Sequence, residues 1–542
     1  MNSKNSIASI DPKYYWLSLI IFYLATRIYN LTAFPIFSDE AIYIHWAQII
    51  SHDWSELFIS KTDGKLPLFS WLVALIISFY EDPLIPGRIV SVMAGMFTLV
   101  GVIHIGRNFY SPAVGVVAGI LYITCPYALH LERMAMLESL LTACGVWMII
   151  LAHKIASSKP ESFFQYIALG IVMGMAFLTK ATALLFLPVL VFIFLSKKVW
   201  SRPELLKGLS LSLAIPLLMS LPFFLSSQAP VFENRHAVFN NPEYYLSMDT
   251  LLSFPVMVWW RNLWVIADFY KEYLSVALLL LILIFLADTL VQKSQEGWIL
   301  IFWAVFPPAV VLLIANGFYS RYFLLAVPPV ILMGARGFIC AIKFLTQKFN
   351  FFTEGSKLRE ASILLIGSVF LSFVVSNNMY LSAKLILNPD KAPLPQLDRL
   401  LYLEGMSSGF GLKRAAQYLK EESKKSPIIL MTTIDLGNPQ EGLSIYLWGK
   451  RNIKVIPVTW WPRFSSLIPE KETFPLLASK HQRTPLRQES VSKLKNVFFL
   501  YPFTTYPEQK FLKENPKFEK VWTHTHFNGK DSITIYKQKT LL

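Results

Sequence analysis

The first 380 or so positions of the chain are dominated by long apolar runs separated by short polar connections. Eleven runs are interpreted as membrane-spanning helices, because an apolar helix of about 20 residues crosses a bilayer. A twelfth run, residues 66–80, has only 15 residues and contains Pro67. It would reach about 22 Å, so we expect it to lie in the membrane interface. The predicted spans are residues 14–34, 84–106, 112–130, 135–153, 164–179, 182–196, 208–226, 273–291, 298–315, 322–342 and 361–381.

The charges in the connections predict the side on which each one lies. Connections assigned to the inner side hold 14 Lys and Arg in 63 residues, whereas those assigned to the outer side hold 8 in 106 residues. Basic loops favour the cytoplasmic side of a membrane. We therefore predict a multi-pass protein of the plasma (inner) membrane with a cytoplasmic N-terminus and an extracytoplasmic C-terminus.

The pattern changes from residue 388 onward to short apolar strands and amphipathic helices. Strands are predicted at residues 428–432, 453–458, 496–500 and 533–536, and helices at 411–422 and 508–514. Three prolines within Pro389–Pro395 predict a linker. The sequence thus predicts a polytopic α-helical membrane domain of about 11 spans, residues 1–387, followed by an extracytoplasmic α/β domain, residues 388–542.

The composition agrees with a membrane protein. The chain is 54% hydrophobic and 16% charged, against about 25% charged for a typical soluble domain, which excludes an ordinary cytosolic enzyme. Residues 388–542 carry +10 of the net charge of +15, so we expect this domain to face anionic lipid or polymer. All three cysteines fall in apolar runs, so that domain has no disulfide framework. Its Trp460 and Trp461 either contact carbohydrate or serve packing.

Ionisable residues gather at the predicted outer ends of the spans. Such groups are costly beside hydrocarbon unless they are paired or hydrated, so a cluster of them at one membrane face is a candidate functional site. The members are Asp39, Glu40, Asp63, Lys65, Arg88, Arg133, Glu138, Lys180 and Arg321. For Arg88, and for Arg27 inside the first span, the structural alternative is an ion pair with Asp82 or Asp39.

Asp39 lies in the first turn of a helix predicted after the first span, with Ser38 as a suitable N-cap. The apolar stripe of this helix, which is suited to lying on a bilayer, consists of Ile42, Trp46, Ile49 and Ile50. Two interpretations of Asp39 stay open. Its carboxylate either complements the helix dipole or acts as a general base at the membrane surface.

For three cations and a second acid, a structural and a functional interpretation are again possible. Lys65 and Lys180 lie at the ends of apolar runs, where they either snorkel to the interface or bind an anionic head group. Arg321, beside Tyr322, either anchors a span or offers a planar fork to a phosphate. Glu138, at the outer end of the fourth predicted span, is a functional candidate because an intramembrane carboxylate is costly.

The chain contains no GxxxxGK[ST], HExxH or CxxC motif and no GxGxxG after a strand, so nucleotide-driven transport and zinc-protease chemistry lose support. Two rival classes stay open. One is a secondary transporter, whose ionisable residues would lie near the bilayer midplane. The other is a membrane-anchored cell-envelope polymer-binding or assembly protein. One outer cavity holding Asp39, Glu138, Lys180 and Arg321 would favour an enzyme, and dispersal of these residues would favour the rivals.

Several motifs occur in a family-specific order between residues 20 and 335. They are Arg27, Asp39-Glu40-Ala41-Ile42-Tyr43, Lys65-Leu66-Pro67-Leu68, Gly87-Arg88, Arg133 with Glu138, Gly174–Lys180 and Ser320-Arg321-Tyr322. In this order the chain resembles the GT-C glycosyltransferases. Within them it is similar to the protein O-mannosyltransferases and the lipid A aminoarabinose transferases.

The resemblance implies transfer of a sugar from a polyprenyl-phosphate donor to a lipid, glycan or protein acceptor at the outer membrane face, with no nucleic-acid partner. It implies Asp39 and Glu138 as catalytic acids. The donor and its phosphate would contact Lys65, Lys180, Arg321, Tyr322, Arg88, Arg133, Glu40 and Tyr43. The expected mechanism is a single displacement with inversion, in which a carboxylate takes the acceptor proton and cations stabilise the leaving phosphate.

Two positions depart from the aminoarabinose transferases. Gly64 stands where they have an acid, and Ile42 where they have an arginine. For this reason lipid A is not carried over as the acceptor, and their metal site is not carried over either. No cofactor is certain, and a divalent metal stays open.

Overall fold

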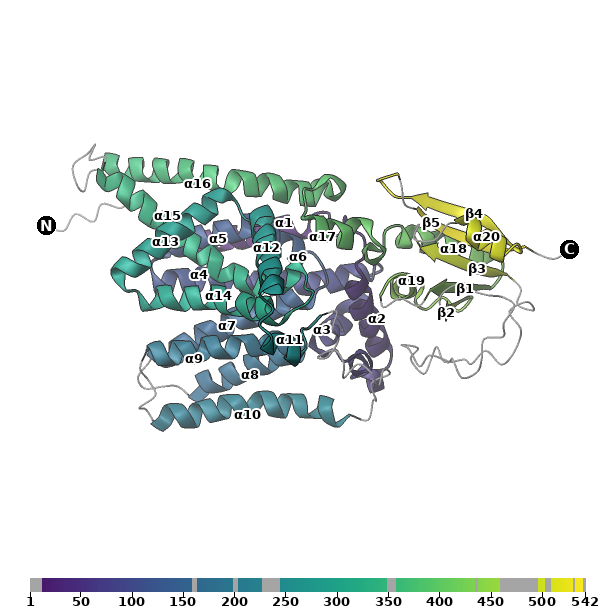
Figure 1. Ribbon diagram of the computed structural model, residues 1–542, viewed down its shortest axis with the longest axis horizontal. Helices are drawn as coiled ribbons and strands as arrows, with labels where there is room; N and C mark the ends of the chain where they lie inside the picture. Colours follow the sequence, from purple (N-terminus) through teal and green to yellow (C-terminus); the bar gives the residue numbers. More distant parts are fainter. Residues whose placement is uncertain are drawn as a thin grey trace.

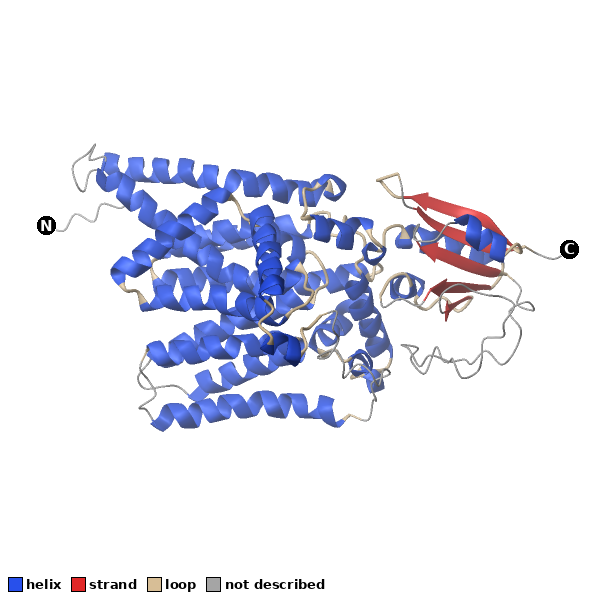
Figure 2. Cartoon of the chain, viewed as in Figure 1, coloured by secondary structure: helices blue, strands red, loops and turns tan. Residues whose placement is uncertain are grey.

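The computed structural model describes residues 12–157, 163–197, 203–226, 244–348, 357–433, 437–458, 496–502, 508–529 and 532–539. It has a helical body and, beyond one end of that body, a smaller domain that contains a β-sheet (Figures 1 and 2). Trp460 and Trp461 lie outside the described residues.

Long helices that run side by side form most of the body (Figure 1). Its first half contains α1 (Pro12–Ile28), α4 (Leu84–Phe109), α5 (Pro112–Thr124), α6 (Pro126–Glu132), α7 (Leu137–Ser157), α8 (Phe163–Thr179), η4 (Ala181–Phe186), α9 (Leu187–Ser196) and α10 (Pro203–Leu225). The second half contains α11 (Met248–Leu252), α12 (Val256–Tyr273), α13 (Val276–Gln292), α14 (Gln295–Ile314), η6 (Ser320–Ala326), α15 (Val327–Lys348) and α16 (Lys357–Leu387).

Within the described residues, six helices are long and apolar enough to cross a membrane, or up to eight if two bent pairs each form one span. Four further apolar helices are shorter: Trp16–Ile28, Leu68–Phe79, Phe163–Thr179 and Ala181–Ser196. The second of these coincides with the run that the sequence assigns to the interface. The structure confirms a helical protein with several membrane spans, and the total of about eleven stays a prediction.

Two sharp bends have no counterpart in the predicted spans. Between α5 and α6 the direction changes by 61°. Pro126 begins α6 there, and proline cannot donate the hydrogen bond that would continue α5. Between α12 and α13 the bend is 111°. The sequence assigns most of α12 to an outer connection, and Figure 1 shows this helix crossing the direction of the long helices.

The loop after α1 folds into five short helical elements beside the end of the body. They are α2 (Ser38–His52), η1 (Trp54–Glu56), η2 (Ile59–Asp63), α3 (Leu68–Ile76) and η3 (Ile77–Phe79). The prediction that the apolar stripe of α2 lies on a bilayer is wrong. Because α3, α4 and α19 (Gln440–Leu447) all pack against α2, its residues from Glu40 to Ile50 are buried inside the protein.

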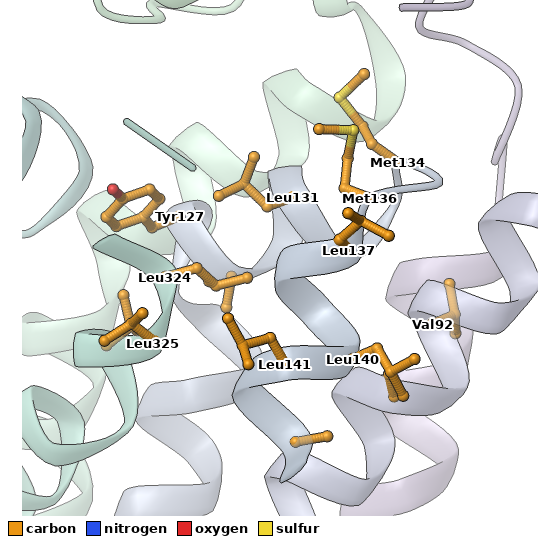
Figure 3. Packing of buried hydrophobic residues seen from close by; sticks show 14 of the residues in the cluster. Val92, Tyr127, Leu131, Met134, Met136, Leu137, Leu140, Leu141, Leu324 and Leu325 are labelled. Atoms are coloured by element: carbon orange, nitrogen blue, oxygen red, sulfur yellow. The ribbon is translucent and has the colours of Figure 1, made fainter. Parts of the chain in front are cut away.

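A buried core joins the elements that carry the candidate site. Figure 3 labels ten of its side chains: Val92, Tyr127, Leu131, Met134, Met136, Leu137, Leu140, Leu141, Leu324 and Leu325. Each fully buried side chain of this kind contributes ~1.5–3 kcal/mol. The core packs η6, which carries Arg321, against α7, which carries Glu138.

A buried ion pair between Glu40 and Arg88 fixes the start of α2. Arg88 Nε and Nη2 each lie 2.8 Å from a Glu40 carboxylate oxygen, and neither side chain is exposed. The other partners are main-chain groups: the carbonyls of Leu31, Phe34 and Pro35 for Arg88, and the N–H groups of Phe37 and Ala135 for Glu40. This pair therefore joins α1, α2, α4 and the turn before α7. It also replaces the pairing with Asp39 or Asp82 that the sequence left open.

Arg27 pairs with Glu132 and not with Asp39 or Asp82. Its Nε lies 3.1 Å from Glu132 Oε2, and the hydroxyls of Tyr23 and Tyr122 donate to the same carboxylate. Arg133 donates to main-chain carbonyls where α1 ends, those of Thr26, Arg27, Tyr29 and Asn30. A cation at this end of a helix also complements the helix dipole.

The C-terminal domain has a five-stranded sheet in the order β2-β1-β3-β5-β4. Its strands are β1 (Ile428–Thr433), β2 (Ile453–Val458), β3 (Val497–Pro502), β4 (Phe518–Thr525) and β5 (Ser532–Gln538). Strand β1 is parallel to β2 and β3, whereas β5 is antiparallel to β3 and β4. In register, Leu430 lies opposite Val455 and Phe498.

The four strands and two helices predicted for this domain are confirmed, and β4 and α19 are additional. The helical elements are η7 (Pro389–Lys391), α17 (Gln396–Arg399), η8 (Leu400–Glu404), η9 (Met406–Ser408), α18 (Leu412–Lys425), α19 and α20 (Glu508–Glu514). The predicted linker follows α16 directly, but it is packed: Pro389, Ala392 and Leu394 are all buried.

The C-terminal domain binds the segment at the start of α2. Asn438 Nδ2 donates to the carbonyls of Ile36 and Ser407 at 2.7 and 2.9 Å. Gly409 has a φ of +61°, and a Cβ there would lie 2.2 Å from the Ile36 oxygen, so this approach requires glycine. Farther along α2, His45 Nδ1 lies 3.2 Å from Glu441 Oε2.

We predict that Arg88→Met destabilises the protein by about 3–5 kcal/mol, because it leaves the Glu40 carboxylate buried and unpaired. Thermal unfolding of the purified protein in detergent measures the effect. The control is Glu421→Gln, which removes an exposed pair with Lys424 and should change stability by less than about 1 kcal/mol. A loss for Arg88→Met no larger than that of the control would contradict this account of α2.

Candidate active site

Asp39 lies between two cations at the N-terminal end of α2. Arg321 Nη2 is 3.1 Å from Asp39 Oδ2, and Lys65 Nζ is 3.4 Å from Asp39 Oδ1. Asp39 and Lys65 are 22% and 28% exposed, so both can be reached from outside, whereas Arg321 is buried. Three segments that are far apart in the sequence thus meet at one carboxylate.

Glu138 extends this cluster on the side of α7. Lys180 Nζ lies 2.7 Å from Glu138 Oε1, and Arg321 Nε lies 3.8 Å from the same oxygen. Arg321 therefore bridges Asp39 and Glu138. Lys65 also contacts a third carboxylate, because Asp63 Oδ2 lies 3.3 Å from its Nζ. Negative and positive groups alternate in this cluster. We name it the catalytic cluster after the role that we propose for it, and it consists of Asp39, Asp63, Lys65, Glu138, Lys180 and Arg321.

Aromatic rings frame the three cations. Lys65 Nζ lies 5.0 Å from the ring centre of Tyr43, and Lys180 Nζ lies 4.4 Å from that of Tyr322. The Arg321 guanidinium lies 4.3 Å from the ring centre of Tyr319. A ring face stabilises a cation without neutralising it. The rings therefore stabilise these cations in addition to the carboxylates that pair with them.

Local backbone structure presents each cation. Gly64, with a φ of +65°, ends η2 directly before Lys65. Lys180 is extended between α8 and η4, so its side chain leaves the helix direction. Arg321 lies in the 3₁₀ segment η6 that precedes α15.

The local charges keep Asp39 ionised. Burial acts to raise the pKa of its carboxyl, but the positive charges of Lys65, Arg321 and Lys180 outweigh burial and hold this pKa below its ordinary value. For Lys65, burial acts to lower the pKa, and Tyr43 and Asp39 outweigh it and raise the pKa. Asp39 is thus a carboxylate, and Lys65 a cation, throughout the neutral range.

Asp398 binds the residue next to Arg321 and so helps to position this member of the cluster. It was not among the residues predicted from the sequence. Ser320, the neighbour of Arg321, donates its hydroxyl to Asp398 at 2.6–2.8 Å, and Tyr273 donates to the same carboxylate. The Tyr127 hydroxyl donates to the Ser320 carbonyl at 2.5 Å. Burial raises the pKa of Asp398 to about 6. The signal in the sequence was weak, because Asp398 follows a proline-rich segment typical of a linker.

The predicted site residues thus fall into two groups. Those in contact around the cluster are Asp39, Glu138, Lys65, Lys180, Arg321, Tyr322 and Tyr43. The remaining three are Glu40, Arg88 and Arg133. They make the internal bonds described above, which hold the segments next to the cluster in place. Their predicted contact with the donor stays a prediction.

The donor atoms of the cluster do not fit a metal site. Asp39 and Glu138 both lie against cations that already neutralise them. Within the described part of the chain, no group of three or more His, Cys, Asp and Glu side chains has the arrangement of a metal site. No step below is therefore routed through a metal.

The chain is similar to known proteins in part of its sequence and in its fold. Residues 64–225 match the family model of dolichyl-phosphate-mannose-protein mannosyltransferases. Among solved structures, ArnT from Cupriavidus metallidurans in the apo state has a TM-score of 0.56 at 13% identity, with 97% of each chain covered. An oligosaccharyltransferase from Archaeoglobus fulgidus has a TM-score of 0.53 at 12% identity and covers 97% of this chain and 74% of its own. No curated protein sequence matches the chain.

These matches define the class of the fold. The chain shares the overall fold of these solved structures over nearly its whole length. The predicted resemblance to GT-C glycosyltransferases is confirmed at this level.

We predict that Asp398→Asn changes how stability depends on pH. The wild-type pKa rises from 3.8 when unfolded to about 6 when folded, so the protonated carboxyl stabilises the fold below pH 4, and this contribution is lost as the pH rises through 6. Its size is about 3 kcal/mol. Melting temperatures between pH 4 and 7 should therefore fall for the wild type relative to Asp398→Asn. Parallel curves for the two proteins would show that Asp398 does not titrate in this range.

Proposed function

We propose that this protein is a membrane glycosyltransferase that moves a sugar from a polyprenyl-phosphate donor to a lipid, glycan or protein acceptor at the outer membrane face. The observation that carries the proposal is the catalytic cluster, in which Asp39 lies between Lys65 and Arg321, and Lys180 lies beside Glu138. The cluster combines a carboxylate base with three cations suited to a phosphate. A transporter site would instead lie near the bilayer midplane.

The cations match the charge that develops on the leaving group. As the bond between the sugar carbon and the phosphate oxygen breaks, a monoanionic phosphodiester becomes a dianionic monoester. Lys65, Lys180 and Arg321 would stabilise the added charge, and fixed donors do this best in a site shielded from water. Their present partners, Asp39 and Glu138, hold them in place before the donor binds.

Asp39 would take the proton of the acceptor. The acceptor oxygen attacks the anomeric carbon from the side opposite the phosphate, its proton passes to the Asp39 carboxylate, and the sugar–phosphate bond breaks with inversion. The lowered pKa of Asp39 ensures that the carboxylate is ionised when the acceptor binds. Glu138 would keep Lys180 and Arg321 directed toward the phosphate.

Two related structures support a polyprenyl-phosphate ligand. ArnT from Cupriavidus metallidurans has been solved with undecaprenyl phosphate, at a TM-score of 0.54 and 11% identity. The Archaeoglobus fulgidus AglB structure holds an inhibitory peptide and a dolichol-phosphate, at a TM-score of 0.51, 12% identity, and coverage of 80% of this chain and 63% of its own. At these identities only the fold is shared, so the ligand class belongs to the proposal.

The proposed orientation follows from the same arrangement. The short helices of the first loop and the C-terminal domain lie at one end of the helical body (Figure 1). Two members of the cluster, Asp39 and Lys65, belong to this first loop. We infer that this end faces outward, that the membrane is the plasma (inner) membrane, and that the N-terminus is cytoplasmic. About eleven spans would then cross the membrane. No nucleic-acid partner is proposed.

We predict that Asp39→Asn lowers the transfer rate at least about 100-fold, because the variant lacks the base that accepts the proton. The measurement is turnover of labelled polyprenyl-phosphate sugars by the purified protein, together with donor binding, which should persist. Asp390→Asn, which alters an exposed aspartate of η7, serves as the matched control. Near-normal turnover by Asp39→Asn would reject Asp39 as the base.

We predict that Lys180→Ala weakens donor binding about tenfold, because a charge-assisted contact to the phosphate is lost. Donor affinity is measured by titration with a polyprenyl phosphate. Lys197→Ala is the matched control, because Lys197 also lies 2.7 Å from a glutamate, Glu296. Lys180 precedes η4 and α9, whereas Lys197 follows the C-terminal end of α9 and is therefore remote from the cluster. If both variants retain full donor affinity, Lys180 only snorkels to the interface.

A further inference from the structure

A cleft of about 690 Å³ lies between the first-loop helices and the C-terminal domain. One wall is the C-terminal end of α2 with the segment from Ile77 to Pro83, and the other is formed by α18, α19 and the turn after α19. Its volume is within the usual range of small-molecule sites. This cleft is separate from the catalytic cluster. Its nearest α2 residue, Gln48, follows Asp39 by nine positions, or about 14 Å of helix.

Three lysines give the cleft its charge. Lys413 pairs with Asp82 at 2.6 Å. Lys420 and Lys450 have no ion-pair partner among the residues that the structure describes, and the one further acid of the lining is the exposed Glu81. Burial lowers the pKa of Lys420, and repulsion from Lys450 and Lys413 lowers it further. An anion in the cleft would relieve this repulsion.

Polar and aromatic groups complete the lining. Gln48 is buried, with an exposed fraction of 7%. Its Nε2 donates to the Ile445 carbonyl, while its Oε1 has no hydrogen-bond partner among the described residues. Trp448 lies across from it, nearly perpendicular to the rings of His45 and His52. The Trp448 indole, which is only partly buried, fits the apolar face of a sugar ring.

We propose that this cleft binds a phosphorylated sugar, with Lys420 and Lys450 on the phosphate and Trp448 on the sugar. Binding here does not depend on the transferase activity. Only the role of the ligand rests on the proposed function, in which it would be a remote part of the acceptor, held away from the reacting oxygen by the length of α2. Remote contacts of this kind orient a substrate at the reacting centre.

The test is calorimetric titration of the full-length protein in detergent with glucose 6-phosphate, with glucose and inorganic phosphate titrated separately. We expect glucose 6-phosphate to bind more tightly than either, and the double variant Lys420→Ala/Lys450→Ala to lose about tenfold or more in affinity. Trp448→Ala should weaken binding of glucose 6-phosphate but not of phosphate.

Two controls separate this site from others. Lys424→Ala removes a cation from the same helix, α18, at an exposed pair with Glu421, and should leave affinity unchanged. Lys180→Ala, which removes a cation from the cluster, should also bind glucose 6-phosphate normally. An equal loss in Lys424→Ala would reveal non-specific attraction, and a loss in Lys180→Ala would move the ligand to the catalytic cluster. Either result, or full affinity in the double variant, overturns the proposal. Absence of sugar transfer in a turnover assay would reject only the proposed function.

Discussion

The buried ion pair between Glu40 and Arg88 is the constraint on which the site depends. Charged groups leave water only when every polar atom is compensated, and here carbonyls from the end of α1 and N–H groups beside α2 and α7 complete the compensation. Because Glu40 cannot move without breaking this network, its neighbour Asp39 is held at a fixed position. An acid that makes internal bonds, Glu40, thus stands directly after an acid of the candidate site, Asp39, in the sequence.

The alternating charges of the catalytic cluster limit the repulsion between like charges in the free protein. Three cations close together at a membrane face would repel one another, and three carboxylates would do the same. Alternation of the two signs removes both penalties, and Tyr43, Tyr319 and Tyr322 add ring faces. Under the proposed function, an arriving phosphate would only have to replace carboxylates at cations that are already in position.

Local patterns predicted most elements and most members of the cluster. Four of the five strands of the C-terminal domain and the short run at 66–80 follow from periodicity and length. The cluster members that follow from their places at span ends are Asp39, Lys65, Glu138, Lys180 and Arg321. The pairings do not follow, because Arg321 and Asp39 are 282 positions apart. Helix α12 escaped prediction because Arg261 and Asp268 interrupt its apolar residues. Asp398 escaped because its partners, Ser320 and Tyr273, become neighbours only in the folded chain.

The binding of the C-terminal domain to the start of α2 has a consequence for the making of the protein. Asn438 binds the carbonyl of Ile36 across 402 positions of sequence. During synthesis, the surface of α2 that contacts the C-terminal domain therefore stays exposed until the region around residue 438 has left the ribosome and folded. A truncated chain would display this unfinished surface, which quality-control proteases can recognise, and it would lack a correctly held Asp39. The position of Asp39 thus depends on residues that are synthesised about 400 positions later.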